Sequence, residues 1–411
     1  MKCLNNLLDD YKVDGKYLLE IREEYRKEVQ SVLERAFSGE AKTFRYGGSL
    51  AKGTANINSC DMDLLCYLES DTNLTLKEIY NTAKKALGKD YNIEVKNSAI
   101  TIKGKKYKSN WGITVDVVPG RFINTDKSDV NLWCNRTQTS LKTNPDKQIN
   151  LVKESNSKEI IRLIKLFREF NNFKFKSFFL EIFAIDIVEK KYEKQDDVMA
   201  KLLKFCDCYN EIGITTINDP ANSNNNIMEI HDELEFKTIR SKIKQLREAL
   251  YTDDEETVKN CILGKYYDID TAYKRVARKH SRLIKFKERY TYTIKGWYSK
   301  NESNYKNIDT TTILEKGMNL KFEITIPNSI PIKKVSWIIC NSGYEARIKN
   351  QLRGDTLEDS NDIDKISMPN NKIFIKTENT AYYGDHYVQA EITSQSGSRY
   401  YSNIITVRIR N

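Results

Sequence analysis

The feature that most constrains this chain is a glycine-rich stretch at residues 47–54 (GGSLAKGT), which is followed by Asp61 and Asp63. Because glycine has no side chain, the backbone amides around Gly48 can approach a phosphate, and Ser49 adds a hydroxyl donor. Asp61 and Asp63 are two residues apart, so on an extended segment their side chains point to the same face. Carboxylate oxygens suit Mg²⁺, which takes further ligands from water and from substrate phosphates. The pattern therefore predicts a phosphate-binding turn beside a site for divalent cations.

A third acid lies in a segment that otherwise has the pattern of a buried strand. Residues 113–118 (ITVDVV) are β-branched except for Asp116. A lone ionised carboxylate is costly to bury unless it is paired or bound to a metal. We therefore expect Asp61, Asp63 and Asp116 to share two divalent ions, one activating a hydroxyl and the other steadying a triphosphate and its leaving pyrophosphate. A loop Asp-x-Asp and a solvated edge Asp are the ordinary alternatives, but the order of the acids after the glycine turn favours the metal site.

The residues around these acids resemble a known family. Their pattern is similar to that of DNA polymerase β-like nucleotidyltransferases, and residues 116–119 (DVVP) resemble its oligonucleotide-synthesising branch. This branch contains the CD-NTases, bacterial relatives of cyclic GMP-AMP synthase and oligoadenylate synthase that make nucleotide second messengers in antiphage defence. The residues that carry the resemblance are Gly48, Ser49, Gly53, Thr54, Asp61, Asp63 and Asp116.

A second set of segments is similar to the helical lobe of the same family. The segments are residues 162–165 (RLIK), 176–181 (KSFFLE) and 219–222 (DPAN). In the family a lysine and a serine of this lobe hold the triphosphate, and an aromatic side chain stacks on a base. The resemblance therefore implies nucleotide-binding roles for Lys165, Lys176, Ser177 and Phe178, beside Gly48 and Ser49 of the turn.

Some of these side chains also have structural alternatives. Ser177 can cap or pack within its helix, and both Phe178 and Phe179 can belong to the core. If one of the two rings faces a base instead, stacking contributes roughly 1–3 kcal/mol.

The chain changes character after residue 290, where short β-rich runs are separated by turn residues. The runs are residues 292–294, 320–326, 335–339, 372–376, 386–392 and 403–409. This pattern predicts a β-sandwich. Most of residues 310–410 resemble the adenylyl/guanylyl and SMODS C-terminal sensor domain, a module found fused to CD-NTases. The resemblance is carried by Trp337 and by residues 341–346 (NSGYEA), 352–354 (LRG) and 378–386 (ENTAYYGDH).

The resemblance to the sensor domain implies a ligand-sensing or regulatory role. Trp337 is expected in the core, because large aromatic residues on strands usually pack the inside of a sandwich. Arg353, Glu378 and His386 are the candidates for ligand recognition. A structural ion pair or a hydrogen bond that fixes a turn is an equal alternative for these three residues.

The predicted architecture is an α/β polymerase β-like nucleotidyltransferase core, a helical lobe and a β-sandwich. We place the core at residues 1–150, the nucleotide-binding helical lobe at 151–290 and the sensor domain at 300–411. In the core, the periodicity predicts helices over 15–37 and 75–87 and strands over 43–46, 92–95, 99–103 and 112–118. In the lobe, residues 157–190 and 227–290 are predicted to be mainly helical, with a loop at 218–226.

The formal net charge of +10 favours polyanionic partners, a description that nucleoside triphosphates and long nucleic acid both fit. Basic clusters lie at residues 103–108 (KGKKYK) and 274–282 (KRVARKHSR). Most charge runs are solvated faces, but phosphate contacts come from such clusters. Nucleic acid therefore stays an alternative activator.

No apolar run approaches the ~20 residues that a membrane span needs, and the N-terminal residues lack the apolar core of a secretion signal. We expect a cytoplasmic protein without a membrane partner, whose eight cysteines are reduced. Structural zinc is not expected, because the chain has three histidines and Cys206 and Cys208 are too closely spaced for a zinc arm.

The sequence thus predicts a template-independent nucleotidyltransferase that uses two Mg²⁺ ions, or Mn²⁺ in their place. It would join nucleoside triphosphates into a cyclic or short linear signal that acts through a downstream effector protein. One alternative is a transferase that adds a nucleotide to RNA, tRNA or protein, or makes a homopolymer. Another is a degenerate sensor that only binds nucleotides, but such a binder has no need for three converging acids.

Overall fold

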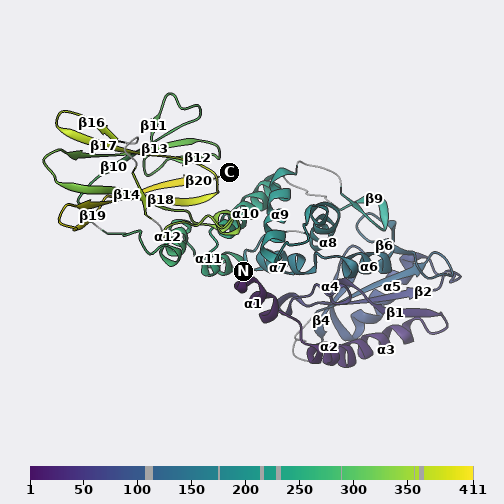
Figure 1. The fold of residues 1–411 in the computed structure, drawn as a ribbon. Coiled ribbons are helices and arrows are strands. Elements are labelled where there is room, and N and C mark those ends of the chain that lie inside the picture. Colours follow the sequence, from purple (N-terminus) through teal and green to yellow (C-terminus); the bar gives the residue numbers. More distant parts are fainter. Residues whose placement is uncertain are drawn as a thin grey trace. The chain divides into compact units, whose positions relative to one another are not determined.

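The computed structural model describes residues 1–410 apart from 107–113, 175, 213–216, 228–232, 288, 356 and 361–364. The chain forms two compact units, which we call the N-terminal unit (Lys2–Ile243) and the C-terminal unit (Lys244–Asn411, with Met1) (Figure 1). The division falls within helix α10 (Glu233–Tyr251). Helices α11 (Glu255–Ile262) and α12 (Ile269–His280), which the sequence assigned to the helical lobe, therefore belong to the same unit as the sandwich.

A mixed sheet forms the centre of the N-terminal unit. Its strands are β1 (Lys42–Tyr46), β2 (Met62–Leu68), β3 (Tyr91–Val95), β4 (Ile100–Lys105), β5 (Val115–Phe122), β6 (Val130–Cys134) and β7 (Thr139–Thr143). The order is β1-β2-β5-β4-β3, with β6 between β5 and β7. Strands β2 and β5 pair in parallel, and their register places Asp63 opposite Asp116.

The two faces of this sheet have different roles because side chains alternate along a strand. Met62, Leu64 and Cys66 of β2 pack with α3 (Lys27–Ala36) and α5 (Leu76–Asp90) in one core cluster. Asp63 alternates with these residues and so shares the opposite face with Leu65 and Tyr67, which pack in a separate small cluster. The same alternation in β5 places Asp116 on the face of Asp63, at the beginning of both strands.

The other helices of the N-terminal unit fall partly in the predicted core, at residues 1–150, and partly in the helical lobe that begins at residue 151. They are α1 (Lys2–Asp10), α2 (Gly15–Ile21), α4 (Gly48–Lys52), α6 (Pro145–Glu154), α7 (Lys158–Phe170), α8 (Ser177–Ile182) and α9 (Val198–Glu211). Helix α5 begins at a capping box, in which the Thr75 hydroxyl accepts from the Glu78 amide and the Glu78 carboxylate accepts from the Thr75 amide. The predicted helix over 15–37 is interrupted by a π-helical turn (Arg22–Arg26) between α2 and α3.

The predicted loop at 218–226 is wrong. These residues form a two-stranded sheet of β8 (Asn218–Asp219) and β9 (Asn222–Asn226). The buried carboxylate of Asp219 organises this hairpin by accepting hydrogen bonds from Gln148 Nε2 at 3.0 Å and from the Ala221 amide at 2.8 Å. The turn-forming composition does not reveal the pairing of β8 with β9 or the long-range hydrogen bond from Gln148.

The C-terminal unit contains a sandwich of two sheets. One sheet has the order β11-β10-β13-β17-β16, and the other has the order β12-β20-β18-β14-β15 with β19 paired to β18. The strands are β10 (Ile294–Ser299), β11 (Lys306–Asn307), β12 (Ile313–Leu314), β13 (Asn319–Pro327), β14 (Ile332–Cys340), β15 (Glu358–Asp359), β16 (Lys365–Ser367), β17 (Asn371–Asn379), β18 (Gly384–Ser394), β19 (Arg399–Tyr401) and β20 (Ile405–Ile409). A short helix, α13 (Tyr344–Ile348), follows β14.

The core of the sandwich lies between the two sheets and includes Trp337, Phe322 and Ile392. Trp337 is buried as predicted, and its indole nitrogen donates to the hydroxyl of Ser360 at 2.8 Å. The predicted α/β core, helical lobe and C-terminal sandwich are confirmed.

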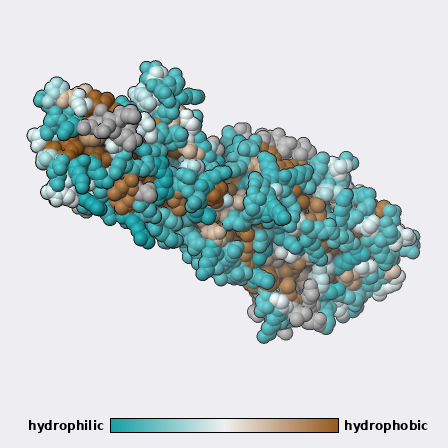
Figure 2. Space-filling view, in the orientation of Figure 1, coloured by the Kyte–Doolittle hydropathy of each residue, from teal (hydrophilic) through white to brown (hydrophobic). Residues whose placement is uncertain are grey.

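Hydrophilic side chains cover most of the face seen in Figure 2. In the part of the chain that the structure describes, no helix combines the length and the apolar character needed to cross a membrane. All eight cysteines are buried and free of disulfides.

Candidate active site

The three predicted acids lie beside one another at the beginning of β2 and β5. Asp63 and Asp116 are register partners on these parallel strands, and Asp61 directly precedes β2. The carboxylate of Asp116 accepts from Thr101 Oγ1 at 2.6 Å and from Lys96 Nζ at 2.8 Å. Asp61 accepts a short hydrogen bond from the hydroxyl of Thr114, the residue that precedes β5.

The glycine-rich turn is fitted closely to Asp63. The Gly47 amide donates to the main-chain carbonyl of Asp63 at 2.9 Å. Gly48 has a φ of +59°, and a β-carbon built on it would lie 1.6 Å from Oδ2 of Asp63. Only glycine fits here, because any side chain would collide with the carboxylate and would also strain the backbone. Gly48 is therefore needed to make room for the Asp63 carboxylate, in addition to its predicted role of letting a phosphate approach the backbone.

The convergence of the acids changes their electrostatics. Burial, followed by the negative charges of Asp116 and Asp61, raises the pKa of Asp63 to about 7. Burial also lowers the pKa of Lys96 to some extent, but its hydrogen bond to Asp116 and the charge of that carboxylate outweigh this and raise it. Like charges that are held this close are stabilised by a proton or by cations.

The donor chemistry of this cluster fits divalent ions, since hard carboxylate oxygens are the ligands that Mg²⁺ and Mn²⁺ prefer. Within the described residues, no three acidic, imidazole or thiol groups are arranged to hold one ion by themselves. Lys96, Thr101 and Thr114 donate hydrogen bonds to two of the carboxylates. Triphosphate oxygens would therefore have to complete the ligand set.

A buried charged network lies next to the acids. Glu181 Oε2 is 2.7 Å from Lys52 Nζ, and Glu181 Oε1 is 2.7 Å from Lys165 Nζ. Lys165 also donates to Thr54 Oγ1 at 2.9 Å. Burial alone would raise the pKa of Glu181, but the charges of the two lysines outweigh it and hold the pKa below its ordinary value. Burial lowers the pKa of Lys165, and Glu181 opposes this.

One pocket of about 260 Å³ joins these groups. The predicted residues that line it are Gly48, Ser49, Asp61, Asp63, Asp116, Lys165, Ser177 and Phe178. Lys176 is exposed just before α8 and is not among the described residues that line the pocket. The structure therefore brings eight predicted residues of the core and the lobe together and leaves one outside.

The two adjacent aromatic residues of α8 have different surroundings. Phe178 is partly buried at the pocket, where Lys52 Nζ lies 4.8 Å from the centroid of its ring. Phe179 is buried and stacks with Phe183 at a centroid distance of 5.7 Å. Ser177 accepts from Arg168 Nη1 at 2.7 Å. Phe178, and not Phe179, is thus placed to meet a base.

Sequence reasoning assigned no role to Lys52, Lys96, Thr101, Arg168 or Glu181. Glu181 had a detectable signal, because it is a single charge in the apolar run FFLEIFAI and such a charge needs a partner when buried. Lys96 and Thr101 had no such signal. Their contact with Asp116 depends on the pairing of β4 with β5, which brings Thr101 opposite that residue.

The three candidate sensor residues also lie together, around a second pocket in the sandwich. Arg353 Nη1 and Nη2 lie 3.0 and 3.1 Å from the two carboxylate oxygens of Glu378. His386 is buried, and its Nε2 is 2.7 Å from the carbonyl of Tyr382. Arg353 has a φ of +52°, an unfavourable backbone for a side-chain-bearing residue that its neighbours must hold in place. The ion pair foreseen as an alternative is therefore present, at the wall of a cavity.

Comparison with known proteins agrees with this fold. Residues 267–410 match the model of the family described as Adenylyl/Guanylyl and SMODS C-terminal sensor domain. The predicted resemblance to CD-NTase-type nucleotidyltransferases that carry this domain is confirmed. No curated protein matches the chain.

Two solved structures illustrate the likeness in fold. The structure of E. coli MS115-1 CdnC with ATP has a TM-score of 0.50 and 19% identity, and the match covers 64% of this chain and 97% of that chain. The Bradyrhizobium diazoefficiens CD-NTase CdnG in complex with GTP has a TM-score of 0.51 and 13% identity, with coverage of 66% and 97%. At these identities the comparison establishes the fold.

Proposed function

We propose that this protein is a template-independent nucleotidyltransferase that joins nucleoside triphosphates into a cyclic or short linear oligonucleotide signal. The observation that carries the proposal is the convergence of Asp61, Asp63 and Asp116 with the glycine turn at one pocket. A protein that only binds nucleotides gains nothing from three adjacent acids, because burial and then the repulsion from Asp116 and Asp61 raise the pKa of Asp63.

In the reaction, a ribose hydroxyl oxygen bonds to the α-phosphorus of a second nucleotide, and the bond from that phosphorus to the pyrophosphate breaks. Bound at Asp61, Asp63 and Asp116, two divalent ions would activate the hydroxyl and neutralise the leaving pyrophosphate. Thr101 fixes the carboxylate of Asp116, which orients the attacking hydroxyl. Ser49 donates a hydrogen bond to phosphate from the turn.

The lobe side of the pocket suits the rest of the nucleotide. The network of two lysines and Glu181 has a net charge of +1 when both lysines are protonated, which favours a triphosphate. Lys165 contributes to this charge while its ammonium group stays bound to Glu181 and Thr54. The ring of Phe178 offers a stacking surface for a base.

The sensor domain gives the proposal its biological setting. By its likeness to CD-NTases, we infer a role in bacterial antiphage defence, in which the nucleotide product acts on a downstream effector protein. The sandwich would bind a regulatory ligand and alter synthesis, without supplying residues for the chemistry. The candidate metal ligands all lie in the N-terminal unit, which agrees with this separation.

The test is product analysis with the full-length protein. The protein is incubated with all four ribonucleoside triphosphates and Mg²⁺ or Mn²⁺. Released pyrophosphate is measured first, and the mixture is then treated with phosphatase and analysed by mass spectrometry. We expect phosphatase-resistant oligonucleotides from the wild type and from the control Asp71→Asn, an exposed turn residue, but not from Asp63→Asn. Transfer of label to RNA or protein instead would support the alternative transferases, and equal products from Asp63→Asn would overturn the proposal.

A further inference from the structure

The positive charge of this chain is concentrated in one short segment of the C-terminal unit. Residues 274–289, which begin within α12, contain eight lysines and arginines and one acid, a net charge of +7. The whole chain has a formal net charge of +10, so the rest of it contributes only +3. The residues that line the nucleotide pocket all lie in the N-terminal unit. The nucleotide site therefore does not account for this local excess.

On α12 the cations lie on the side away from the sandwich. The buried side of the helix includes Tyr273 and Ala277, and Ala277 belongs to a core cluster with Tyr387 of β18. Lys274 and Arg278 are exposed and lie one turn apart on the other side. The helix dipole favours cations in the last turn of α12, but it does not explain the cations that follow the helix.

The residues after α12 are fixed to the sandwich although they form no helix or strand up to residue 287. Ser281 Oγ donates to the carbonyl of Gly354 at 2.8 Å. The buried side chain of Gln389 is bonded to both main-chain groups of Lys285. Its Oε1 accepts from the amide at 2.9 Å, and its Nε2 donates to the carbonyl at 3.2 Å. The cations of this stretch therefore extend from a backbone in a defined position.

Side-chain contacts join α12 to this stretch. The Arg278 guanidinium carbon lies 5.1 Å from the centroid of the Phe286 ring, and Lys285 Nζ donates to the Arg282 carbonyl at 3.1 Å. The exposed cations of the helix and of the following stretch thus belong to one surface. We call it the basic surface and define it by its six exposed cations: Lys274, Arg278, Lys279, Arg282, Lys287 and Arg289.

The basic surface has no acidic partners in the part of the chain that the structure describes. Elsewhere in the same segment, Arg275 is bound by Asp254 at 2.6 Å and by Glu256 at 2.9 Å. None of the six cations that define the basic surface forms an ion pair with a described residue. Their charges are therefore available to a partner molecule.

The same surface offers little besides charge. Among the described residues from 269 to 290, no large hydrophobic side chain is exposed. Peripheral membrane helices insert such side chains into lipid, and the centre of a protein interface is usually built from them. No aromatic ring among these residues is exposed as a platform on which the bases of a single strand could stack. A surface of this kind suits the dense phosphates of a nucleic-acid duplex.

We propose that the basic surface of the C-terminal unit binds double-stranded nucleic acid through its phosphates, without reading the base sequence. Each cation that contacts a phosphate releases counterions from the duplex, which drives binding. The proposed transfer reaction needs no side chain of this surface. Binding of the duplex is therefore a property separate from catalysis, and it goes beyond the proposed function.

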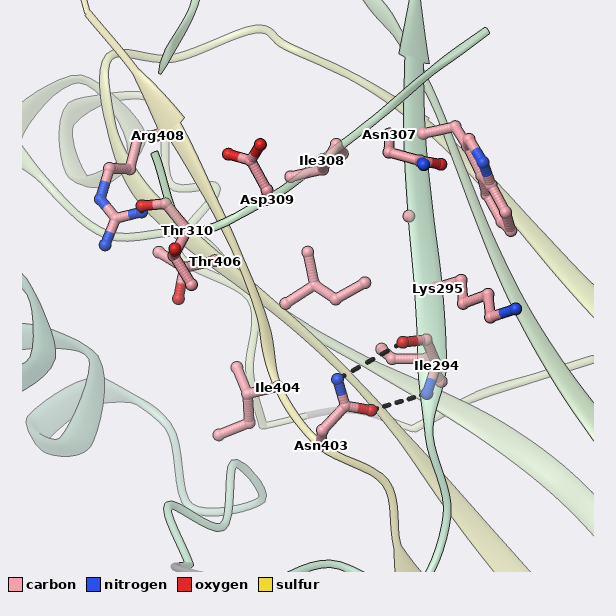
Figure 3. A pocket seen from close by; sticks show the side chains of 13 residues that line it. Ile294, Lys295, Asn307, Ile308, Asp309, Thr310, Asn403, Ile404, Thr406 and Arg408 are labelled. Carbon is pink, nitrogen blue, oxygen red and sulfur yellow. Dashed lines mark hydrogen bonds between the residues drawn. The ribbon is translucent and has the colours of Figure 1, made fainter. Parts of the chain in front are cut away.

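Two other polar features of the C-terminal unit are weaker candidates. Inside the sandwich, four charged side chains form a closed charge network without net charge: Arg353, Glu358, Lys376 and Glu378. A groove of about 580 Å³ runs beside β10 and β20, and Figure 3 shows the Asn403 amide there, bonded to the main-chain nitrogen and the carbonyl of Ile294. Arg408 in the same groove donates to the Thr310 carbonyl at 2.7 Å. These groups are already engaged with neighbouring residues, whereas the cations of the basic surface have no ion pairs among the described residues.

The experiment measures the fluorescence anisotropy of two short DNA duplexes of unrelated sequence with the full-length protein, in EDTA and without nucleotides. Both duplexes should bind equally, and a single strand of the same length should bind more weakly. The logarithm of the binding constant should fall with the logarithm of the salt concentration with a slope of roughly −5, because each of about six phosphate contacts contributes about −0.9. Excess non-hydrolysable nucleoside triphosphate with Mg²⁺ should not displace the duplex, because the basic surface is not part of the nucleotide pocket.

Two pairs of substitutions test the residues. Arg278→Gln with Arg282→Gln should reduce the magnitude of the salt slope by roughly 2 and weaken duplex binding roughly 50-fold at about 0.1 M salt. Lys279→Gln with Arg289→Gln removes two other cations and should have a similar effect. Thermal melting checks that each pair folds, and the second pair decides the matter if the first does not.

The matched control is Lys306→Gln with Lys349→Gln, which removes two exposed lysines from other parts of the same unit and should leave binding unchanged. Equal binding by the wild type and both test pairs, displacement of the duplex by the triphosphate, or tighter binding to phosphatidylserine vesicles than to the duplex would each overturn the proposal. So would a preference for one of the two base sequences. None of these outcomes depends on whether the protein transfers nucleotides.

Discussion

Replacing Asp63 by Asn is expected to abolish nucleotide transfer and at the same time to stabilise the metal-free N-terminal sheet above neutral pH. The pKa of Asp63 is raised from 3.8 to about 7, so the folded protein binds this proton more tightly than the unfolded chain does. Stability therefore falls as the pH rises from about 4 to about 7 and stays low above that window. At roughly 1.36 kcal/mol per pKa unit, the full effect is about 4 kcal/mol. Because the Asn amide also has to be desolvated, we expect about half of this gain from the variant.

Hydrogen exchange of the amides of β2 and β5 measures this local stability, with wild type and variant compared at the same pH in EDTA. The protection of Asp63→Asn should exceed that of wild type at pH 8, and the difference should shrink at pH 5. Mg²⁺ with a non-hydrolysable nucleotide should protect the wild type and not the variant. Asp71→Asn is the matched control and should behave as wild type. Lower protection of Asp63→Asn at pH 8, or a gain of equal size at both pH values, would refute the electrostatic reasoning.

Four further outcomes test the site. Ser49→Ala should weaken nucleotide binding and turnover together by roughly 10- to 150-fold, the value of one hydrogen bond to a charged group; unchanged kinetics would show that the turn does not hold phosphate. Asp61→Asn with Asp63→Asn should eliminate turnover while circular dichroism stays the same, and residual synthesis near the wild-type rate would exclude the metal role. Glu181→Ala leaves two buried lysines without a counter-charge and should lower the free energy of unfolding by about 3–5 kcal/mol, as measured by urea denaturation. An unchanged free energy of unfolding would contradict this. At limiting Mg²⁺, turnover should rise with pH through about 7 as Asp63 ionises, and the rise should move to lower pH when Mg²⁺ saturates; a profile independent of Mg²⁺ would argue against metal binding at this carboxylate.

The sequence predicts β1, β3, β4 and β5 of the central sheet, because their signals are local, but it does not predict the extents of β2, β6 and β7. The β-branched run around Asp116 indicates a buried strand, and the spacing of Asp61 and Asp63 indicates that both face one side. The partners of the acids are not predictable in this way. Lys96 and Thr101 reach Asp116 through strand pairing across the sheet, and a pairing order cannot be deduced from periodicity.

In the sensor domain, too, contacts that depend on strand pairing cannot be predicted from local sequence signals. Arg353, Glu378 and His386 were identified through short segments that resemble a family, whereas Glu358 and Lys376 complete the charge network without any local signal. Their inward direction follows from the register of β15 with β14 and of β17 with β13. The ordinary turn and strand residues around them give no indication that a sandwich interior holds charges.

The most direct measurement of the central claim is a crystal structure of the full-length protein with Mn²⁺ and a non-hydrolysable nucleoside triphosphate, recorded with anomalous scattering. The account predicts Mn²⁺ peaks bounded by Asp61, Asp63 and Asp116, with the triphosphate along the turn at Ser49 and its base on Phe178. An ordered triphosphate in this pocket without a metal peak beside the three acids would contradict it, and so would a nucleotide bound elsewhere in the chain.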